Sequence, residues 1–270
     1  MKICLIGCGK MGSALLEGWS ILKTIKEIIV IEPNNENISK SLINNKKFNF
    51  YNSLSKIKNS DIFDITVLAV KPQIMKEVVS QLAELRIKSD SWLSIAAGLK
   101  VKFFEEYLGR NQSIIRTIPN TPSSILKGVT AVHFNSNCNK NVIENSILLM
   151  DAVGETIQVK NEELMDSYTA VSGSGPAYIY YMIEAMIEAA IGIGISQKDA
   201  RVLAEKTLIG SAYLLEHTNE EVHKLRKDVT SPKGTTEAGL KVLMENNNFF
   251  NIVGSAIKEA QKRGKDLGKT

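Results

Sequence analysis

The first 160 residues alternate between short apolar runs and segments in which apolar residues recur with helical spacing. The apolar runs predict strands at residues 2–6, 27–32, 61–70, 91–97 and 112–118. A further strand, helix and strand are expected between residues 130 and 159. Such alternation is typical of right-handed βαβ units around a mostly parallel sheet, so we predict an α/β domain over residues 1–160.

After this domain every segment has helical spacing. The predicted helices cover residues 176–191, 197–215, 220–226, 236–244 and 249–264. Ser196 with Asp199, and Thr218 with Glu221, resemble capping boxes at two helix starts, and Ser174 is expected to cap the long helix that follows it. We therefore predict an all-helical domain over residues 161–270, with no low-complexity linker.

Composition excludes some classes of protein. Of the 270 residues, 44% are hydrophobic and 23% charged, which is typical of a globular protein. The net charge is only +4, and the basic residues are interleaved with acids, so no nucleic-acid partner is expected. Glu184 and Glu188 interrupt the most apolar stretch one helical turn apart, which favours an interface helix over a membrane span.

The cysteines and the start of the chain suggest a compartment. Cys4, Cys8 and Cys138 are odd in number, and we expect them to be buried reduced thiols in a cytoplasmic protein. Met1 leads directly into an apolar strand and then glycines, which is unlike a signal peptide.

The segment GCGKMG directly follows the first predicted strand. Gly7, Gly9 and Gly12 fit the spacing at which glycines allow a tight turn, a close approach to a pyrophosphate and close packing of a helix on a strand. Glu32 follows Gly12 by 20 residues at the end of the second strand, where an acid would bind the adenosine ribose. The sequence therefore predicts a bound NADH or NADPH.

Other strand ends should face the same ligand, because open parallel sheets bind ligands beyond the carboxyl ends of their strands. For Lys71, a phosphate or ribose contact and a solvated surface position are equally open, while Arg116 is expected to be structural. The predicted cofactor-binding residues are Gly7, Cys8, Gly9, Lys10, Met11, Gly12, Glu32, Asn34, Ala69, Val70, Lys71, Pro72, Ala97, Gly98 and Asn120.

A second chemical signal is SPKGTTEAG, residues 231–239. Ser231 offers a hydroxyl, Gly234 shapes a turn, and Thr235 and Thr236 lie at the start of a predicted helix, where unpaired N–H groups favour an anion. The alternative is that these hydroxyls only cap the helix, and the residues alone leave both open. His217 and His223 are six residues apart and His133 is remote, so we predict no metal site.

Six ordered blocks resemble the pyrroline-5-carboxylate reductase family. They are GCGKMGSALLEGW, AVKPQ, SIAAG, IRTIPNTP, VSGSGPAYIYYMIEAM and DVTSPKGTTEAGL, and they span nearly the whole chain. The resemblance implies an α/β fold, in which an amino-terminal Rossmann-type dinucleotide-binding domain is followed by an all-α dimerisation domain. It also implies that NADH or NADPH reduces a cyclic imine to L-proline, the last step of proline biosynthesis.

The family's motif gives roles to the turn at residues 231–236. It implies that Ser231, Gly234, Thr235 and Thr236 bind the substrate, the turn holding its carboxylate, and that Thr236 is the catalytic residue that donates to the imine nitrogen. Lys233 stands where the family usually has glycine, and we expect it to have an ordinary negative φ.

The resemblance also implies partners. It indicates at least a dimer, with the substrate turn completed across subunits, and leaves open a larger ring of dimers. The long helix at residues 176–191 is apolar nearly all round, which agrees with burial in such an interface.

Two other functions remain open, and one preference follows from Glu32. The alternatives are a non-catalytic dinucleotide-binding regulatory paralogue and a dehydrogenase of the β-hydroxyacid type, which uses a helical-domain lysine for which this sequence offers no clear candidate.

Because Glu32 would accept hydrogen bonds from ribose hydroxyls but repel a 2′-phosphate, we expect NADH to serve at least as well as NADPH. Asn34 tempers this expectation, because an amide can donate to a phosphate.

Overall fold

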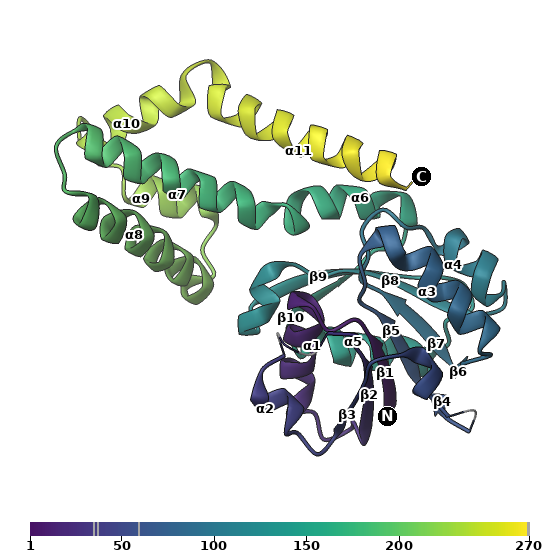
Figure 1. The fold of residues 1–270 in the computed structure, drawn as a ribbon. Helices are drawn as coiled ribbons and strands as arrows, with labels where there is room; N and C mark the ends of the chain where they lie inside the picture. The colour runs from purple at the N-terminus through teal and green to yellow at the C-terminus, as the bar shows by residue number, and fades with distance from the viewer. Residues whose placement is uncertain (35, 37, 59, 269–270) are drawn as a thin grey trace. The chain divides into compact units, whose positions relative to one another are not determined.

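A computed structural model describes residues 1–34, 36, 38–58 and 60–268, and its chain forms two compact units (Figure 1). The first unit contains Met1–Ser174 and the segment that begins at Ala260, and the second contains Gly175–Glu259. The first unit therefore extends past the boundary predicted at residue 160. The reason is that Met165 is fully buried in a cluster with Ile118 and Val159, so the chain after the last strand still belongs to the core of the first unit.

The first unit is built on an eight-stranded sheet in the order β10-β9-β8-β7-β5-β1-β2-β3. Neighbouring strands are parallel except β8 and β9, so the predicted mostly parallel sheet is confirmed. The strands are β1 (Lys2–Ile6), β2 (Glu27–Ile31), β3 (Phe48–Tyr51), β5 (Ile65–Leu68), β7 (Ser91–Ser94), β8 (Ser113–Ile118), β9 (Gly128–Phe134) and β10 (Gly154–Gln158), with a separate pair β4 (Ile62–Phe63) and β6 (Lys88–Ser89).

Helices cover both faces of this sheet. The helices of the first unit are α1 (Lys10–Ser20), α2 (Lys40–Ile43), α3 (Pro72–Glu84), α4 (Val101–Leu108), α5 (Lys140–Asp151) and α6 (Met165–Tyr168), and a π-helix (Thr169–Gly173) follows α6. Alternate residues of β1 belong to different cores: Ile3 and Leu5 pack with α1 and α5, whereas Cys4 and Ile6 pack with α3 and α4. Burial on both faces explains why β1 reads as a continuous apolar run.

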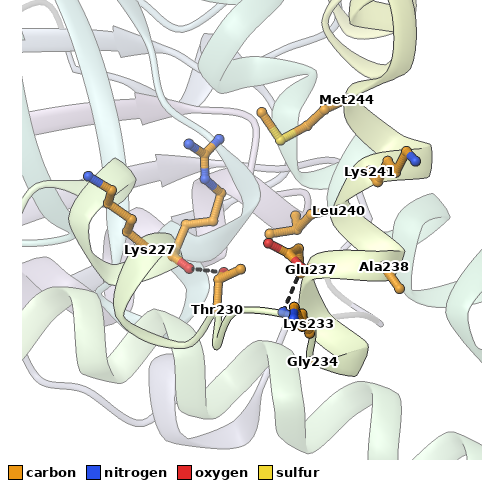
Figure 2. Close-up of a pocket in the computed structure, with 10 residues that line it drawn as sticks. Lys227, Thr230, Lys233, Gly234, Glu237, Ala238, Leu240, Lys241 and Met244 are labelled. Atoms are coloured by element: carbon orange, nitrogen blue, oxygen red, sulfur yellow. Dashed lines mark hydrogen bonds between the residues drawn. The ribbon is translucent and has the colours of Figure 1, made fainter.

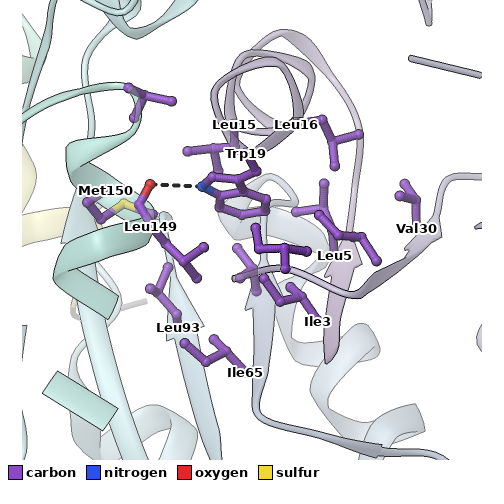
Figure 3. Packing of buried hydrophobic residues seen from close by; sticks show 14 of the residues in the cluster. Ile3, Leu5, Leu15, Leu16, Trp19, Val30, Ile65, Leu93, Leu149 and Met150 are labelled. Carbon is purple, nitrogen blue, oxygen red and sulfur yellow. Dashed lines mark hydrogen bonds between the residues drawn. The ribbon is translucent and has the colours of Figure 1, made fainter. Parts of the chain in front are cut away.

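The core beneath α1 centres on Trp19, which is fully buried (Figure 3). Its indole Nε1 donates to the carbonyl oxygen of Leu149 in α5 at 2.8 Å, so the ring fills the core without leaving a polar group unpaired. Gly18 lies at the same contact: a Cβ there would come within 2.5 Å of Val153 Cγ1. The close packing of α1 therefore depends on a glycine, and it fixes the helix whose first turn faces the predicted cofactor site.

The second unit is helical. It contains α7 (Gly175–Gly192), α8 (Gln197–Thr218), α9 (Val222–Asp228), α10 (Thr235–Met244) and most of α11 (Asn248–Leu267), whose last turns belong to the first unit. Ser196 caps α8 by accepting from the N–H of Asp199, as predicted. The second predicted capping box is wrong, because Thr218 ends α8 and its hydroxyl donates to the carbonyl oxygen of Leu214.

The expected cap at Ser174 is also wrong. Ser174 has helical φ and ψ and its N–H donates to the carbonyl oxygen of Thr169, so the π-helix leads directly into α7. Of the cysteines, all free, Cys4 and Cys8 are buried and Cys138 is half-buried, which corrects the expectation that all three are buried.

Candidate active site

The Gly-rich loop between β1 and α1 has the backbone that its sequence predicts. Gly7 has a φ of +93°, and a Cβ there would lie 2.6 Å from the carbonyl oxygen of Ala69. Gly12 is pressed against the carbonyl of Gly7, so a side chain would separate α1 from the loop. These two glycines let the ends of β1 and β5 and the start of α1 meet closely.

Gly9 differs from its neighbours because nothing lies within 4 Å of the position its Cβ would occupy. It is also the N-cap of α1, and it provides no side-chain cap for the N–H groups of the first turn. Lys10 and Met11 begin that turn. The loop thus offers open space beside unpaired backbone donors, which is the arrangement that a pyrophosphate needs.

Glu32 is aimed at this loop. Its Oε2 accepts from the N–H of Cys8 at 2.7 Å, and its Oε1 accepts from the N–H of Asn34 at 3.0 Å. Each carboxylate oxygen keeps a further acceptor site for a ribose hydroxyl. Burial raises the pKa of the Cys8 thiol, opposed by the hydrogen bond with Ser13 and reinforced by the Glu32 carboxylate.

The segment after β5 lines the other side of the loop. Ala69 and Val70 approach Gly7, and a Cβ on Gly7 would lie 3.0 Å from Val70 Cγ1. Lys71 is the N-cap of α3 and is exposed, and Pro72 occupies the first turn of that helix. The side chain of Asn34 is also exposed, and its Oδ1 accepts from the N–H of Glu36. The positions of Lys71 and Asn34 are thus compatible with either a ligand contact or a solvated side chain.

Three of the predicted cofactor-binding residues lie in or beside buried parts of the first unit. Asn120 is 8% exposed; its Nδ2 donates to the carbonyl oxygen of Ser172, and its Oδ1 accepts from the N–H of Val129. It therefore ties the loop after β8 to β9 and to the π-helix. Gly98 has a φ of +83° in the turn that follows β7, and Ala97 beside it packs against a buried cluster.

An ion pair that the sequence does not reveal supports this turn. Arg116 is buried and donates from Nη1 to Glu162 Oε1 at 2.6 Å, and the same oxygen accepts from the N–H of Val101 at 2.7 Å. Burial raises the pKa of the nearby Asp166 carboxyl, although Arg116 and Lys100 oppose the shift. Arg116 is therefore structural, as predicted, while Glu162 carries no local sequence signal because its partners lie far away in the chain.

The second candidate site is the turn at residues 231–236 in the helical unit. The N–H of Gly234 donates to the carbonyl oxygen of Ser231 at 3.0 Å, and α10 begins at Thr235 with Gly234 as its N-cap. Within the described part of the chain, the hydroxyls of Ser231, Thr235 and Thr236 make no hydrogen bond, so they do not cap the helix. Three hydroxyls and the free N–H groups of a helix start thus remain for a ligand.

Lys233 corrects one expectation. Its φ is +59°, in the left-handed region, rather than an ordinary negative value. Its backbone N–H donates to Glu237 Oε2 at 2.7 Å, which helps to hold the turn in this conformation. Lysine therefore adopts here the conformation for which glycine is suited, at a cost in strain.

A pocket of about 580 Å³ lies beside this turn, between α9 and α10 (Figure 2). Figure 2 shows Glu237 joined to the backbone nitrogen of Lys233. The charged residues that line the pocket are Arg226, Lys227, Lys233, Lys241 and Glu237. The excess of basic groups favours an anionic ligand near the turn.

No group of three or more His, Cys, Asp or Glu side chains in the described part of the chain is placed to hold a metal ion. In residues 1–34, 36, 38–58 and 60–268, no helix is long and apolar enough to cross a membrane.

Both the amino-terminal and the carboxy-terminal part of the chain are similar to known proteins. A family model described as pyrroline-5-carboxylate reductase dimerisation matches residues 162–267, and one described as NADP oxidoreductase, coenzyme F420-dependent, matches residues 2–98. The pyrroline-5-carboxylate reductase 2 of Bacillus subtilis is 32% identical over 98% of this chain and 95% of its own length. The pyrroline-5-carboxylate reductase of Synechocystis is 33% identical over 100% of this chain and 99% of its own.

Solved structures agree. A pyrroline-5-carboxylate reductase from Coxiella burnetii superposes with a TM-score of 0.85 at 33% identity, covering 99% of this chain and 98% of that one. The pyrroline carboxylate reductase of Plasmodium falciparum with NADP bound gives 0.83 at 30% identity, with the same coverage. The predicted Rossmann-type and helical dimerisation domains are therefore confirmed, and the chain belongs to the pyrroline-5-carboxylate reductase family of NAD(P)H-dependent oxidoreductases.

Proposed function

We propose that the Gly-rich loop with Glu32 holds the cofactor, and that the turn at residues 231–236 holds the substrate, in the reaction of this family. That reaction reduces the cyclic imine 1-pyrroline-5-carboxylate to L-proline, the last step of proline biosynthesis. The observation that carries the assignment of the turn is its uncapped helix start, where Ser231, Thr235 and Thr236 keep their hydroxyls free.

In this reaction, these residues mainly bind and orient the substrate. The free backbone N–H groups of Thr235 and Thr236 at the start of α10 receive the substrate carboxylate, because a helix start favours an anion. The imine reacts in its protonated form, so the ring nitrogen already carries the proton that the amine product needs. As the adjacent carbon accepts hydride, the C=N π pair becomes a lone pair on the nitrogen, and the hydroxyl of Thr236 donates a hydrogen bond to that lone pair as it forms. A bound reduced nicotinamide supplies that hydride, so most of the acceleration comes from positioning.

Thr236→Val tests this role. The variant keeps the shape of the side chain and removes the hydroxyl, so we expect kcat to fall about 100-fold, as for loss of one donor in a catalytic site, while the KM for NADH stays unchanged. Thr207→Val is the matched control, because Thr207 is an exposed threonine within α8. Wild-type turnover in Thr236→Val would exclude the assignment.

We further propose that the enzyme uses NADH at least as well as NADPH. Support comes from the direction of the Glu32 carboxylate, which accepts from Cys8 of the Gly-rich loop. No lysine or arginine follows Glu32 before Lys40, so a 2′-phosphate would meet a negative charge without a cationic partner.

The test compares kcat/KM for the two cofactors in wild type and Glu32→Ser. We expect the preference to move towards NADPH by about tenfold, which corresponds to about 1.4 kcal/mol. Glu36→Ser is the control, because only the backbone N–H of Glu36 contacts Asn34. A strong NADPH preference in wild type, or an unchanged ratio in Glu32→Ser, would overturn the assignment.

The chain self-associates through its dimerisation domain, and we propose a cytoplasmic assembly of dimers that extends to a larger ring. Exposed apolar side chains on α10 and α11, in addition to those on α7 and α8, support contacts beyond one interface. The mass from light scattering tests this: a ring gives a multiple of the dimer mass, and a plain dimer rejects it.

A further inference from the structure

The end of α11 lies directly against the Gly98 turn of the first unit, although the two are far apart in sequence. A Cβ on Gly98 would lie 3.0 Å from Leu267 Cβ and 3.4 Å from the backbone nitrogen of Gly268. In the other direction, a Cβ on Gly268 would lie 2.5 Å from the carbonyl oxygen of Gly98. The two backbones can approach this closely only because both positions are glycine.

One face of α11 continues this contact along the first unit. Gln261, Gly264 and Gly268 share that face, since they are spaced by three and four residues. Gln261 Nε2 donates to Ser167 Oγ at 2.6 Å, and a Cβ on the buried Gly264 would lie 3.3 Å from Asp166 Cβ. The N–H of Gly268 donates to the carbonyl oxygen of Gly264 at 3.3 Å, which carries the helical path to the Gly98 turn.

The other end of the turn is also fixed. Glu162 accepts from the N–H of Val101, and Lys100 Nζ forms an ion pair with Glu163 at 2.6 Å. Glu162 therefore holds residue 101, while the end of α11 holds residue 98. A glycine turn with a positive φ would otherwise sample many backbone states.

The sheet order places this turn in one half of the cofactor site. Gly98 follows β7, which lies on the opposite side of β1 from β2, the strand that Glu32 follows. A dinucleotide crosses such a sheet with its pyrophosphate at the first strand and its adenosine ribose at the acid. The turn at Ala97 and Gly98 therefore belongs to the nicotinamide half.

We propose that the segment Gly264–Gly268 at the end of α11 positions the Gly98 turn for the nicotinamide half of the cofactor. Gly268 and Leu267 act through Gly98 and are positioning residues. This inference rests on the proposed function, in which Ala97 and Gly98 line the cofactor site.

The test uses Gly268→Ala, which wedges α11 from the turn, and measures the dissociation constants of NADH and of adenosine diphosphate ribose, which lacks the nicotinamide. We expect Gly268→Ala to raise the dissociation constant of NADH about fivefold and to leave that of adenosine diphosphate ribose unchanged. Gly254→Ala is the matched control, because a Cβ on Gly254 in the same helix meets nothing within 4 Å. Equal weakening of both ligands, or of neither, overturns the inference.

Two further experiments separate the possible failures. Ala97→Val adds bulk to the turn itself. If Ala97→Val weakens NADH binding while Gly268→Ala does not, only the role of α11 is wrong; if neither variant weakens NADH binding, the cofactor role of the turn is wrong too. In the wild-type protein, NADH but not adenosine diphosphate ribose should slow amide hydrogen exchange at residues 264–268, because coupling between two sites is reciprocal. Exchange that NADH leaves unchanged contradicts the proposal without any variant.

Discussion

At the scale of single residues, the left-handed conformation of Lys233 should lower the stability of the helical unit, and this can be tested. Its φ of +59° costs a side chain that has a Cβ about 1 kcal/mol, so Lys233→Gly should raise the free energy of unfolding of the helical unit by about that amount. Lys206→Gly, at an exposed position in the interior of α8, is the control and should lower it by about 1 kcal/mol, because glycine weakens a helix interior. Urea unfolding followed by circular dichroism measures both, and a loss of stability in both variants would show that the turn carries no strain.

The ion pair of Arg116 with Glu162 is a second residue-scale feature with a measurable consequence. The side chain of Arg116 is 3% exposed and that of Glu162 is 21% exposed, so Glu162→Gln leaves a buried guanidinium without its counter-charge. We expect a loss of about 2 to 3 kcal/mol in the free energy of unfolding, below the full cost of a wholly buried pair. Glu163→Gln removes the exposed partner of Lys100 instead and should leave the unfolding midpoint unchanged. Equal effects of the two changes would contradict the structural role of Arg116.

Which residues could be predicted depended on how local their signals are. Gly7, Gly12 and Glu32 are set by a short spacing within one βαβ unit, and the structure places them together. Glu162 contacts residues 46 and 61 positions away, and no pattern in the chain links them. Lys233 was misjudged because a single substitution within a turn does not show whether the backbone changed or the strain was kept.

At the scale of elements, the fit of α1 against α5 depends on Gly18. A Cβ at this position would lie 2.7 Å from the carbonyl oxygen of Ala152 as well as 2.5 Å from Val153 Cγ1. We expect Gly18→Ala to lower the free energy of unfolding by about 2 kcal/mol through overpacking. Both tryptophans, Trp19 and Trp92, lie in the first unit, so their fluorescence reports its unfolding.

The control for this change is Gly210→Ala, since a Cβ at Gly210 in α8 meets nothing within 4 Å. It should leave the unfolding transition followed by tryptophan fluorescence unchanged. Because alanine favours a helix more than glycine does, it should raise the free energy of unfolding of the helical unit by up to about 1 kcal/mol. A Gly18→Ala protein as stable as wild type would mean that α1 can shift without loss, and the argument for a closely fixed loop would fail.

Helices and strands could be predicted where the hydrophobic periodicity is strong, and less well where pairing with a neighbouring strand determines the structure. The strands β1, β2, β5, β7 and β8 appear near their predicted positions, because burial on both faces gives continuous apolar runs. The strand β3, Phe48–Tyr51, carries a weak signal because only Phe48 of its four residues is buried and the strand lies at the edge of the sheet. The antiparallel direction of β9 against β8 was missed, since hydrophobic spacing carries no information on strand direction.

At the scale of the whole molecule, the two units differ in how much core each has. The first has continuous clusters on both faces of its sheet, whereas α7, α9 and α10 have no buried residue and α8 buries only Ala200 and Ala204 in the described chain. Such a unit buries too little apolar surface to offset the entropy of ordering its helices. The dimerisation domain must therefore gain much of its stability from the partner subunit.

Stability that comes from association depends on protein concentration by mass action. We expect the midpoint of thermal unfolding followed by the helical circular dichroism signal to rise by several degrees over a roughly hundredfold increase in concentration. The midpoint followed by tryptophan fluorescence should move less, because Trp19 and Trp92 report the first unit, which has its own core. Tyr181 of α7 is exposed in the single chain, and the dimer that we propose would bury the apolar surface of α7. Replacing Tyr181 by glutamate should then lower the helical midpoint and remove its concentration dependence, because the charge would be desolvated. A helical transition that is independent of concentration in wild type would show that the helices of the second unit are stable on their own, and the surface exposed on α7 and α8 would need another explanation.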